Sequence, residues 1–224
     1  MKIPLIYPKI PDSRNCPLKK CIVFEKIDGT NLHIHYLYRD WKSFGTRRDS
    51  FEYTLEGKLE FIKEHPELEK ALDCDIELLN DLREYLKSLE KYNKEEIVLF
   101  FEFAGDKSFA GQHSENDNHR LWLIDVSIGE RMLGPEEFLM DFASFNLYMP
   151  PIIFKGKYSG MLVENIKNGR MLVNEGCVIK GMIDSEFATK YNGIIQPYMC
   201  KVKTNAYMER LKIEFKDNWG KYWE

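Results

Sequence analysis

Every apolar run in this sequence is short, and this limits the folds that the chain can form. The longest run, IVLFF at residues 97–101, has the length of a single β-strand, whereas a helix needs about 20 apolar residues to cross a membrane. Other runs of similar size, such as CIVF and LWLI, alternate with polar or charged segments. The pattern predicts a globular, strand-rich protein with no membrane partner.

Short apolar segments predict β-strands along most of the chain. The first is expected at CIVFE, the second at LHIHYLYRDW, and the next within KSFGTRRDSFEY, with a turn at Gly45. Later strands are expected within residues 96–105, 121–128, 150–159, 169–181 and 195–205.

Residues 56–91 differ from the rest because their apolar residues recur at helical spacing. From Leu72 to Leu86 the apolar side chains fall on one stripe, with charged residues elsewhere. Pro66 is expected to divide a short first helix from a longer second one. The segment GPEEFLMDFASF predicts a further helix. The predicted fold class is therefore α+β, an antiparallel, β-rich domain with an inserted helical pair at 56–91.

Composition adds limits on size, compartment and partners. The 224 residues, 44% of them hydrophobic, suit one domain spanning 1–224. The N-terminus MKIPLIYPKIPDSRN lacks the apolar core of a signal peptide, so a cytoplasmic location is expected. Five cysteines without a CxxC pair argue against a disulfide framework and a structural zinc site. The net charge of −4 disfavours nucleic-acid binding overall, although a local basic groove would still permit it.

Three features carry candidate chemistry. Lys26 lies in the acidic turn FEKIDGTN, which suits a fixed amine at the mouth of a pocket. Glu102 interrupts an apolar run, where an ionised carboxylate needs a partner; a strand-edge glutamate facing solvent is the alternative. Lys201 and Lys203 alternate along CKVK and share a face, which indicates a bound anion such as phosphate. Lysines that protect an exposed edge strand are the alternative there.

Taken in chain order, these features resemble the covalent nucleotidyltransferases, namely polynucleotide ligases and mRNA capping enzymes. The likeness is strongest to ATP-dependent RNA ligases of the phage and RNA-editing type. The Lys-x-(Asp/His)-Gly signature of that family is matched by KIDG, which begins at Lys26. The later family motifs are matched in order by TRR, EFAG, LWLID, EGCVIK and KVK. Single motifs of this length arise by chance, but the ordered set covers residues 22–205.

The resemblance implies an ATP-grasp-like ligase adenylation domain and a set of site residues. Lys26 would be the catalytic nucleophile, and Glu175 would position hydrated Mg²⁺ or Mn²⁺. The side chains expected to contact the nucleotide are Glu25, Ile27, Asn31, Arg47 (or Arg48), Glu102, Ile124 (or Trp122), Lys180, Lys201 and Lys203. Among these, Glu102 would hold the ribose, Glu25 the adenine edge, Ile124 the adenine face and Lys180 a phosphate.

The implied reaction begins with attack of Lys26 on the α-phosphorus of ATP. The resulting lysyl-AMP would pass AMP to a 5′-phosphate RNA end, and a 3′-hydroxyl would then seal the strand. Because the nucleophile is a free amine, the pKa of Lys26 is expected to fall well below about 10.4. Lys201, Lys203 and the divalent ion would lower it.

Other functions fit parts of the same pattern. A minimal DNA ligase and a capping guanylyltransferase share the signature lysine. A module that binds nucleotides or RNA ends without sealing them is the alternative outside the enzyme class. Ligases of this family usually carry a second, C-terminal domain, which the few residues after Asn205 cannot form. No such domain is therefore expected in this chain, and a partner subunit that replaces it for sealing is a further alternative.

Overall fold

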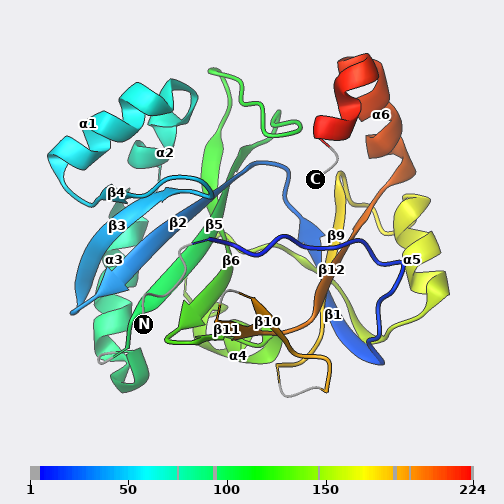
Figure 1. Ribbon diagram of the computed structural model, residues 1–224, viewed down its shortest axis with the longest axis horizontal. Helices are drawn as coiled ribbons and strands as arrows, with labels where there is room; N and C mark the ends of the chain where they lie inside the picture. Colours follow the sequence, from blue (N-terminus) through cyan, green and yellow to red (C-terminus); the bar gives the residue numbers. More distant parts are fainter. Residues whose placement is uncertain are drawn as a thin grey trace.

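The computed structural model describes residues 6–74, 76–92, 95–145, 147–183, 186–191 and 193–222, with only the backbone described at 76 and 77. Its strands form two sheets, against which the helices pack (Figure 1). The larger sheet has the order β10-β11-β7-β6-β5-β2-β3-β4, and the smaller sheet has the order β12-β9-β1-β8. Neighbouring strands run antiparallel, except that β11 pairs in parallel with β7. The predicted α+β, antiparallel-rich class is confirmed.

The strands are β1 (Lys20–Lys26), β2 (Thr30–Leu37), β3 (Asp40–Thr46), β4 (Phe51–Glu52), β5 (Ile97–Gly105), β6 (His119–Ile128), β7 (Arg131–Met132), β8 (Ile152–Lys157), β9 (Gly176–Lys180), β10 (Thr189–Tyr191), β11 (Ile194–Gln196) and β12 (Met199–Lys203). The helices are α1 (Leu55–Glu64), α2 (Glu69–Asp73), α3 (Ile76–Ser88), α4 (Pro135–Phe142), α5 (Gly160–Lys167) and α6 (Asn205–Phe215), with 3₁₀ turns η1 (Pro66–Leu68), η2 (Glu90–Tyr92) and η3 (Lys216–Lys221). None of the described helices is long and apolar enough to span a membrane.

Strand β5 is covered on both faces, which explains its continuous apolar sequence. Phe101 and Phe103 join the main core beneath the helices, whereas Val98 and Phe100 join a second cluster on the opposite face. Because side chains alternate along a strand, Glu102 shares the face of Val98 and Phe100. The glutamate therefore points away from the helical side and toward the region between the two sheets.

The segment predicted as two helices forms three. Helix α1 is capped by Thr54 and ends just before Pro66, as predicted. The predicted second helix is wrong in its continuity, because the backbone at Cys74 is extended and separates α2 from α3. The Cys74 thiol lies at this break and donates a hydrogen bond to the carbonyl of His119 at 3.4 Å. The break between α2 and α3 thus coincides with a hydrogen bond to strand β6. The helical spacing of apolar residues does not predict this break.

The predicted second strand, LHIHYLYRDW, is in fact two strands. Tyr38 and Arg39 have φ values of 53° and 65°, the left-handed conformation of a two-residue hairpin turn. The predicted turn at Gly45 is also wrong, since Gly45 lies inside β3. Glycine is required there by a close approach, because a Cβ would lie 2.1 Å from the carbonyl oxygen of Asp49.

Helices α5 and α6 were not expected from the strand-like patterns around them. Each begins at a hydroxyl N-cap, Ser159 for α5 and Thr204 for α6. Such caps are a sequence signal for a helix start. Helix α5 packs on the smaller sheet, and α6 stands at the end of the molecule where the chain leaves β12 (Figure 1).

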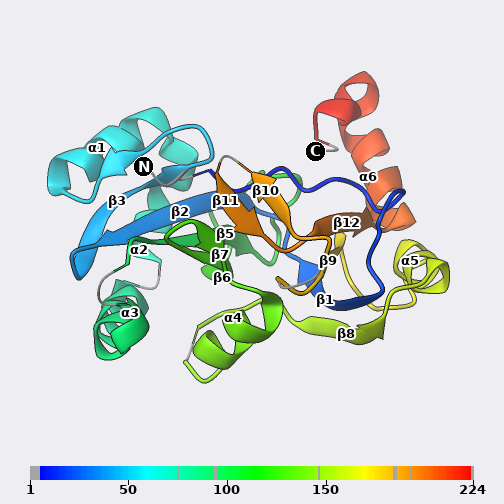
Figure 2. The same ribbon diagram turned by 60° about the horizontal axis from the view of Figure 1, so that its bottom comes forward.

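The N-terminal arm before β1 connects the two sheets. In both views it runs, in dark blue, from the larger sheet toward β12 and α5 (Figures 1 and 2). The Tyr7 ring packs on Phe100 with centroids 5.2 Å apart. Further along, the backbone N–H of Lys201 donates to the carbonyl of Pro11 at 2.8 Å. The arm thereby covers the outer edge of β12.

Candidate active site

A cleft of about 440 Å³ is lined by residues from both sheets, the N-terminal arm and the α6–η3 segment. It contains the whole predicted set, namely Glu25, Lys26, Ile27, Asn31, Arg47, Glu102, Ile124, Glu175, Lys180, Lys201 and Lys203. Arg48, the alternative to Arg47, also lines the cleft. Trp122, the alternative to Ile124, packs instead on Tyr148, with ring centroids 5.8 Å apart. The fold thus brings together side chains that the sequence spreads over most of its length.

The turn after Lys26 is fixed by close packing against β5 and the loop that follows it. Both carboxylate oxygens of Asp28 accept from the backbone N–H of Ala110, at 2.9 and 3.0 Å. Gly29 lies against β5 so closely that a Cβ would be 2.2 Å from the carbonyl oxygen of Phe103. The glycine of the signature is therefore required by backbone contact, and the aspartate by a hydrogen bond to a neighbouring loop.

Gly29→Ala is expected to lower the free energy of unfolding by about 1–3 kcal/mol, because the new methyl group displaces a β5 carbonyl or the turn itself. Urea denaturation measures this change. Gly160→Ala is the matched control, since a Cβ at the first residue of α5 meets no atom within 4 Å. Equal stability of wild-type protein and Gly29→Ala would contradict the close packing of the turn.

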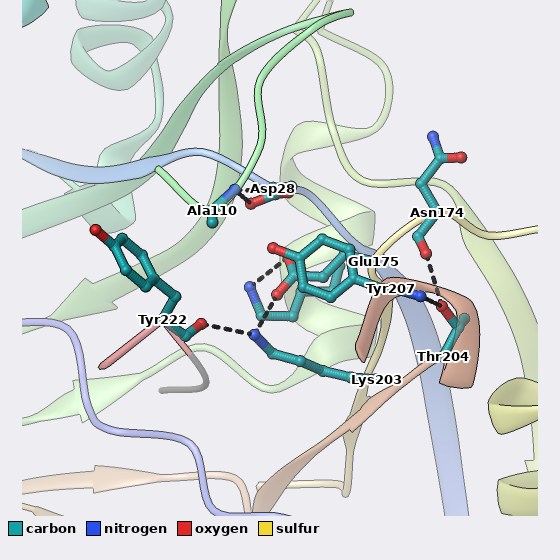
Figure 3. A network of polar contacts seen from close by, with 9 residues as sticks. Asp28, Ala110, Asn174, Glu175, Lys203, Thr204, Tyr207 and Tyr222 are labelled. Carbon is teal, nitrogen blue, oxygen red and sulfur yellow. Dashed lines mark hydrogen bonds and ion pairs between the residues drawn. The ribbon is translucent and has the colours of Figure 1, made fainter. Parts of the chain in front are cut away.

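Lys26, Glu175 and Lys203 form a continuous ion-paired chain. Figure 3 shows the part between Glu175 and Lys203. The Nζ of Lys26 lies 2.8 Å from Oε2 of Glu175, and the Nζ of Lys203 lies 3.0 Å from Oε1. The Glu175 side chain is 2% exposed and that of Lys203 is 3% exposed. The buried carboxylate is therefore shared by the predicted nucleophile and the last lysine of the KVK motif.

The carboxylates around Lys26 act against the expected lowering of its pKa. Burial does act to lower the pKa of Lys26, but the negative charges of Glu175, Glu102 and Asp28 outweigh it and raise the pKa above its usual value. In this structure the amine is thus an ammonium group near neutral pH. The sequence motif places the cations correctly but does not reveal how closely the carboxylates surround Lys26.

Glu102 and Asn31 occupy opposing positions on β5 and β2. Burial raises the pKa of Glu102 to about 7, although the charges of Lys26 and Arg47 oppose this. The Asn31 amide donates to the carbonyl of Phe101 at 3.1 Å. Glu102 is consequently a carboxyl group that changes charge near neutral pH inside the cleft.

Glu102 should make stability fall with rising pH. The pKa of Glu102 is higher in the folded than in the unfolded protein, so the folded state holds this proton more tightly. The stabilisation from this tighter proton binding is fully present below pH about 4.5, the ordinary pKa of a glutamate. It is lost as the pH rises through about 7, the pKa of Glu102 in the folded protein. Glu102→Gln is therefore expected to gain stability relative to wild type between pH 5 and pH 8, measured by urea denaturation at both values. A difference that does not change with pH would contradict the raised pKa.

Lys180 lies at a different part of the cleft from the Lys26–Glu175–Lys203 chain. Its Nζ donates to Oδ2 of Asp125 at 2.7 Å and to the carbonyl of Ile124 at 2.9 Å. The hydroxyl of Tyr7 donates to the same Asp125 oxygen. Burial, followed by the charge of Asp125, raises the pKa of Tyr7, so this phenol stays neutral.

Sequence reasoning did not assign Asp125 or Tyr7 to the site. Asp125 follows Ile124 in the LWLID motif, and its charge within an apolar strand is the signal that could have identified it. Tyr7 has no local signal, because it reaches the cleft through the path of the N-terminal arm. Lys201, which is 9% exposed, also lines the cleft at the edge covered by this arm.

The carboxylates of the cleft suit a hard divalent cation, which prefers oxygen ligands. Glu175, Glu102 and Asp28 all line it, and the charges of Glu175 and Glu102 act on one another. A second group with suitable donor atoms, Asp49, Glu64 and His65, lies near the rim, with its ligand atoms within 4.8 Å of one another. In this second group, Asp49 already has the His65 ring as a partner at 2.7 Å. Glu175, Glu102 and Asp28 therefore fit a metal–nucleotide complex better, because they line the cleft itself.

The chain belongs to the RNA ligase family, because the RNA ligase family model matches residues 19–192. No curated protein sequence matches it significantly. Among solved structures it is similar to the Naegleria gruberi RNA ligase with PPi, with a TM-score of 0.62 and 15% identity over 95% of this chain and 60% of that chain. Variants of that ligase with ATP and Mn and with AMP and Mn give TM-scores of 0.59 and 0.61, each at 16% identity over 93% of this chain and 59% of that chain. The chain thus spans about 60% of the length of these structures, which share its fold.

Proposed function

We propose that this protein is an ATP-dependent RNA ligase that forms a covalent lysyl-AMP at Lys26. The observation that carries the proposal is the Lys26–Glu175–Lys203 chain inside a cleft that also holds Glu102. A partly exposed amine beside further cations and a buried carboxylate is the arrangement that nucleotidyl transfer to lysine needs. Membership of the RNA ligase family supports RNA ends as the substrate. The Mn and nucleotide of the similar Naegleria structures support ATP and a divalent ion.

The first step forms a bond from Nζ of Lys26 to the α-phosphorus of ATP and breaks the bond from that phosphorus to the bridging oxygen. Pyrophosphate leaves, and the Lys26 ammonium loses two of its three protons, so that the phosphoramidate nitrogen keeps one. In the second step, an RNA 5′-phosphate oxygen attacks the same phosphorus and frees Lys26. In the third, a 3′-hydroxyl attacks the activated 5′-phosphate and releases AMP.

The cleft residues supply binding and charge stabilisation for these steps. Glu102 and Asn31 would bind the ribose, Glu25 and Ile27 the adenine edge, and Ile124 one face of the base. Arg47, Lys201 and Lys203 would neutralise phosphate charge. Lys180 has one N–H left for the nucleotide, because an ammonium has three donors and two are used by Asp125 and Ile124.

Glu175, with Glu102 and Asp28 nearby, would hold the divalent ion. Bound there, Mg²⁺ or Mn²⁺ supplies positive charge that stabilises the phosphates and disfavours protonation of Lys26. Glu175 would then leave its ion pair with Lys26, which frees the amine to attack.

Incubation with ATP and Mn²⁺ tests the proposal. Label at the α-phosphate of ATP should become covalently attached to the protein, whereas label at the γ-phosphate should not. The labelled bond should be stable in base and labile to acid and hydroxylamine, as expected of a phosphoramidate. Addition of RNA with 5′-phosphate and 3′-hydroxyl ends should release the label and produce sealed strands. Matched DNA ends provide the comparison for the DNA ligase alternative.

Each step of this experiment excludes a different function. The protein used must be folded and must carry no AMP before the experiment. If such protein takes up no α-label, the result would contradict self-adenylylation and favour a binding module. Labelling without sealing of any RNA would contradict ligation by this chain alone and favour a partner subunit. Preference for GTP would favour the capping-enzyme alternative.

A further inference from the structure

Tyr207 joins two parts of the cleft that are far apart in sequence. It lies in the first turn of α6, where its backbone N–H donates to the N-cap hydroxyl of Thr204 at 3.1 Å. The side chain is 7% exposed and lines the cleft. Figure 3 shows its ring between Lys203 and the turn that carries Asp28.

The polar end of Tyr207 contacts the nucleophile turn. Its hydroxyl faces the carboxylate of Asp28 (Figure 3), and burial, followed by the charges of Glu175 and Asp28, raises the pKa of the phenol. The same carboxylate accepts the Ala110 N–H. Asp28 therefore lies between the Ala110 N–H, from which it accepts, and the neutral Tyr207 phenol, which can donate to it, two positions beyond Lys26.

The ring of Tyr207 contacts the KVK strand and a small apolar cluster. The Nζ of Lys203 lies 5.0 Å from the ring centroid, a cation–π contact. The centroid of the ring of Phe109, which precedes Ala110 in the chain, lies 5.2 Å from the centroid of the Tyr207 ring. Packing against Phe109 and Leu211 fixes the ring, so that the hydroxyl has a defined direction.

We propose that the Tyr207 hydroxyl donates to Asp28 and that Tyr207 thereby acts, through Asp28 and Lys203, as a positioning residue for AMP transfer to Lys26. Without its hydroxyl, Asp28 keeps only the Ala110 N–H, and the nearby Lys26 ammonium becomes the competing partner. An Asp28–Lys26 ion pair would hold the amine toward its own turn and away from an α-phosphorus. The inference rests on the proposed function for its reaction, but the hydrogen bond to Asp28 is testable without it.

Tyr207→Phe removes the hydroxyl and keeps the ring. The rate constant of protein labelling at saturating ATP is expected to fall about 3- to 10-fold, as for loss of one hydrogen bond of ordinary strength. The ATP concentration at half-maximal rate should stay unchanged, because the hydroxyl is assigned to Asp28 and not to ATP. In hydrogen–deuterium exchange, peptides that contain Ala110 should exchange faster. Tyr53→Phe is the matched control, since Tyr53 is a partly buried tyrosine packed on the main core, away from the cleft.

The two measurements separate the possible results. An unchanged rate constant would overturn the positioning role, and a change confined to the half-saturating ATP concentration would make Tyr207 an ATP ligand instead. If wild-type protein takes up no label, the proposed function fails. Exchange at Ala110 then still decides whether Tyr207 holds the turn: faster exchange in Tyr207→Phe alone supports it, and equal exchange in all three proteins overturns it.

Discussion

Lys26→Ala protein is expected to acquire no label from α-labelled ATP under conditions in which wild-type protein is labelled. Covalent transfer requires the amine at this position, and two other described lysines that line the cleft are held in ion pairs by carboxylates. Lys203 is bound to Glu175, and Lys180 is bound to Asp125. Loss of at least about 10³-fold is expected, since removal of a covalent nucleophile eliminates the step rather than slowing it. Gel autoradiography measures the incorporation.

Two controls make this result specific. Lys19→Ala removes an exposed lysine near the start of β1, whose side chain is 82% exposed, and should label as wild type does. RNA that already carries AMP on its 5′-phosphate should still be sealed by Lys26→Ala protein, because only the first two steps need the amine. Label on Lys26→Ala protein would contradict Lys26 as the nucleophile. Failure to seal the activated RNA, with wild type active, would show that the substitution damages more than the nucleophile.

Glu175→Ala is expected to reduce both stability and AMP transfer. Lys203 and Lys26 both lose their carboxylate partner, and the Lys203 side chain is 3% exposed. Removal of one member of a buried ion pair costs about 3–5 kcal/mol, because the remaining charge stays desolvated. Urea denaturation measures this loss. Labelling by α-labelled ATP should fall by at least about 10²-fold and should not recover at high Mn²⁺, since the proposed oxygen ligand is absent.

An exposed pair provides the comparison for Glu175. Glu136 lies 2.8 Å from Lys155, with both side chains more than half exposed, so Glu136→Ala should cost less than about 1 kcal/mol. The double substitution Glu175→Leu with Lys203→Met separates the two effects. It should recover part of the stability, because a buried pair replaced by apolar groups leaves fewer desolvated charges, but it should not recover labelling. Recovery of labelling would contradict a direct role of Glu175 in the reaction.

The sequence predicted best those features that depend on local chemistry. Lys26, Glu102 and Glu175 each stand out by motif or by a charge within an apolar segment, and the cleft contains all three. The strands at β5 and β6 follow from short apolar runs. Features that depend on distant contacts were missed: the break at Cys74 accompanies a bond to the carbonyl of His119.

The site residues that were not predicted depend on the path of the backbone. Tyr7 reaches Asp125 only because the arm crosses between the sheets, and Tyr207 reaches Asp28 only because α6 begins directly after β12. Neither path is encoded in the spacing of nearby residues. The effect of the carboxylates that raise the pKa of Lys26 was missed in part for the same reason, since Glu175 and Glu102 reach the amine from segments distant in sequence.

The ion pair between Lys26 and Glu175 also bears on the chemical durability of the protein. A neutral lysine amine in an open cleft would react with small electrophiles such as isocyanate or aldehydes, and each reaction would destroy the enzyme permanently. An ammonium held on a carboxylate has no free electron pair and resists such damage. Under the proposed function, the resting protein would thus keep its nucleophile in an unreactive form until the metal ion and nucleotide bind.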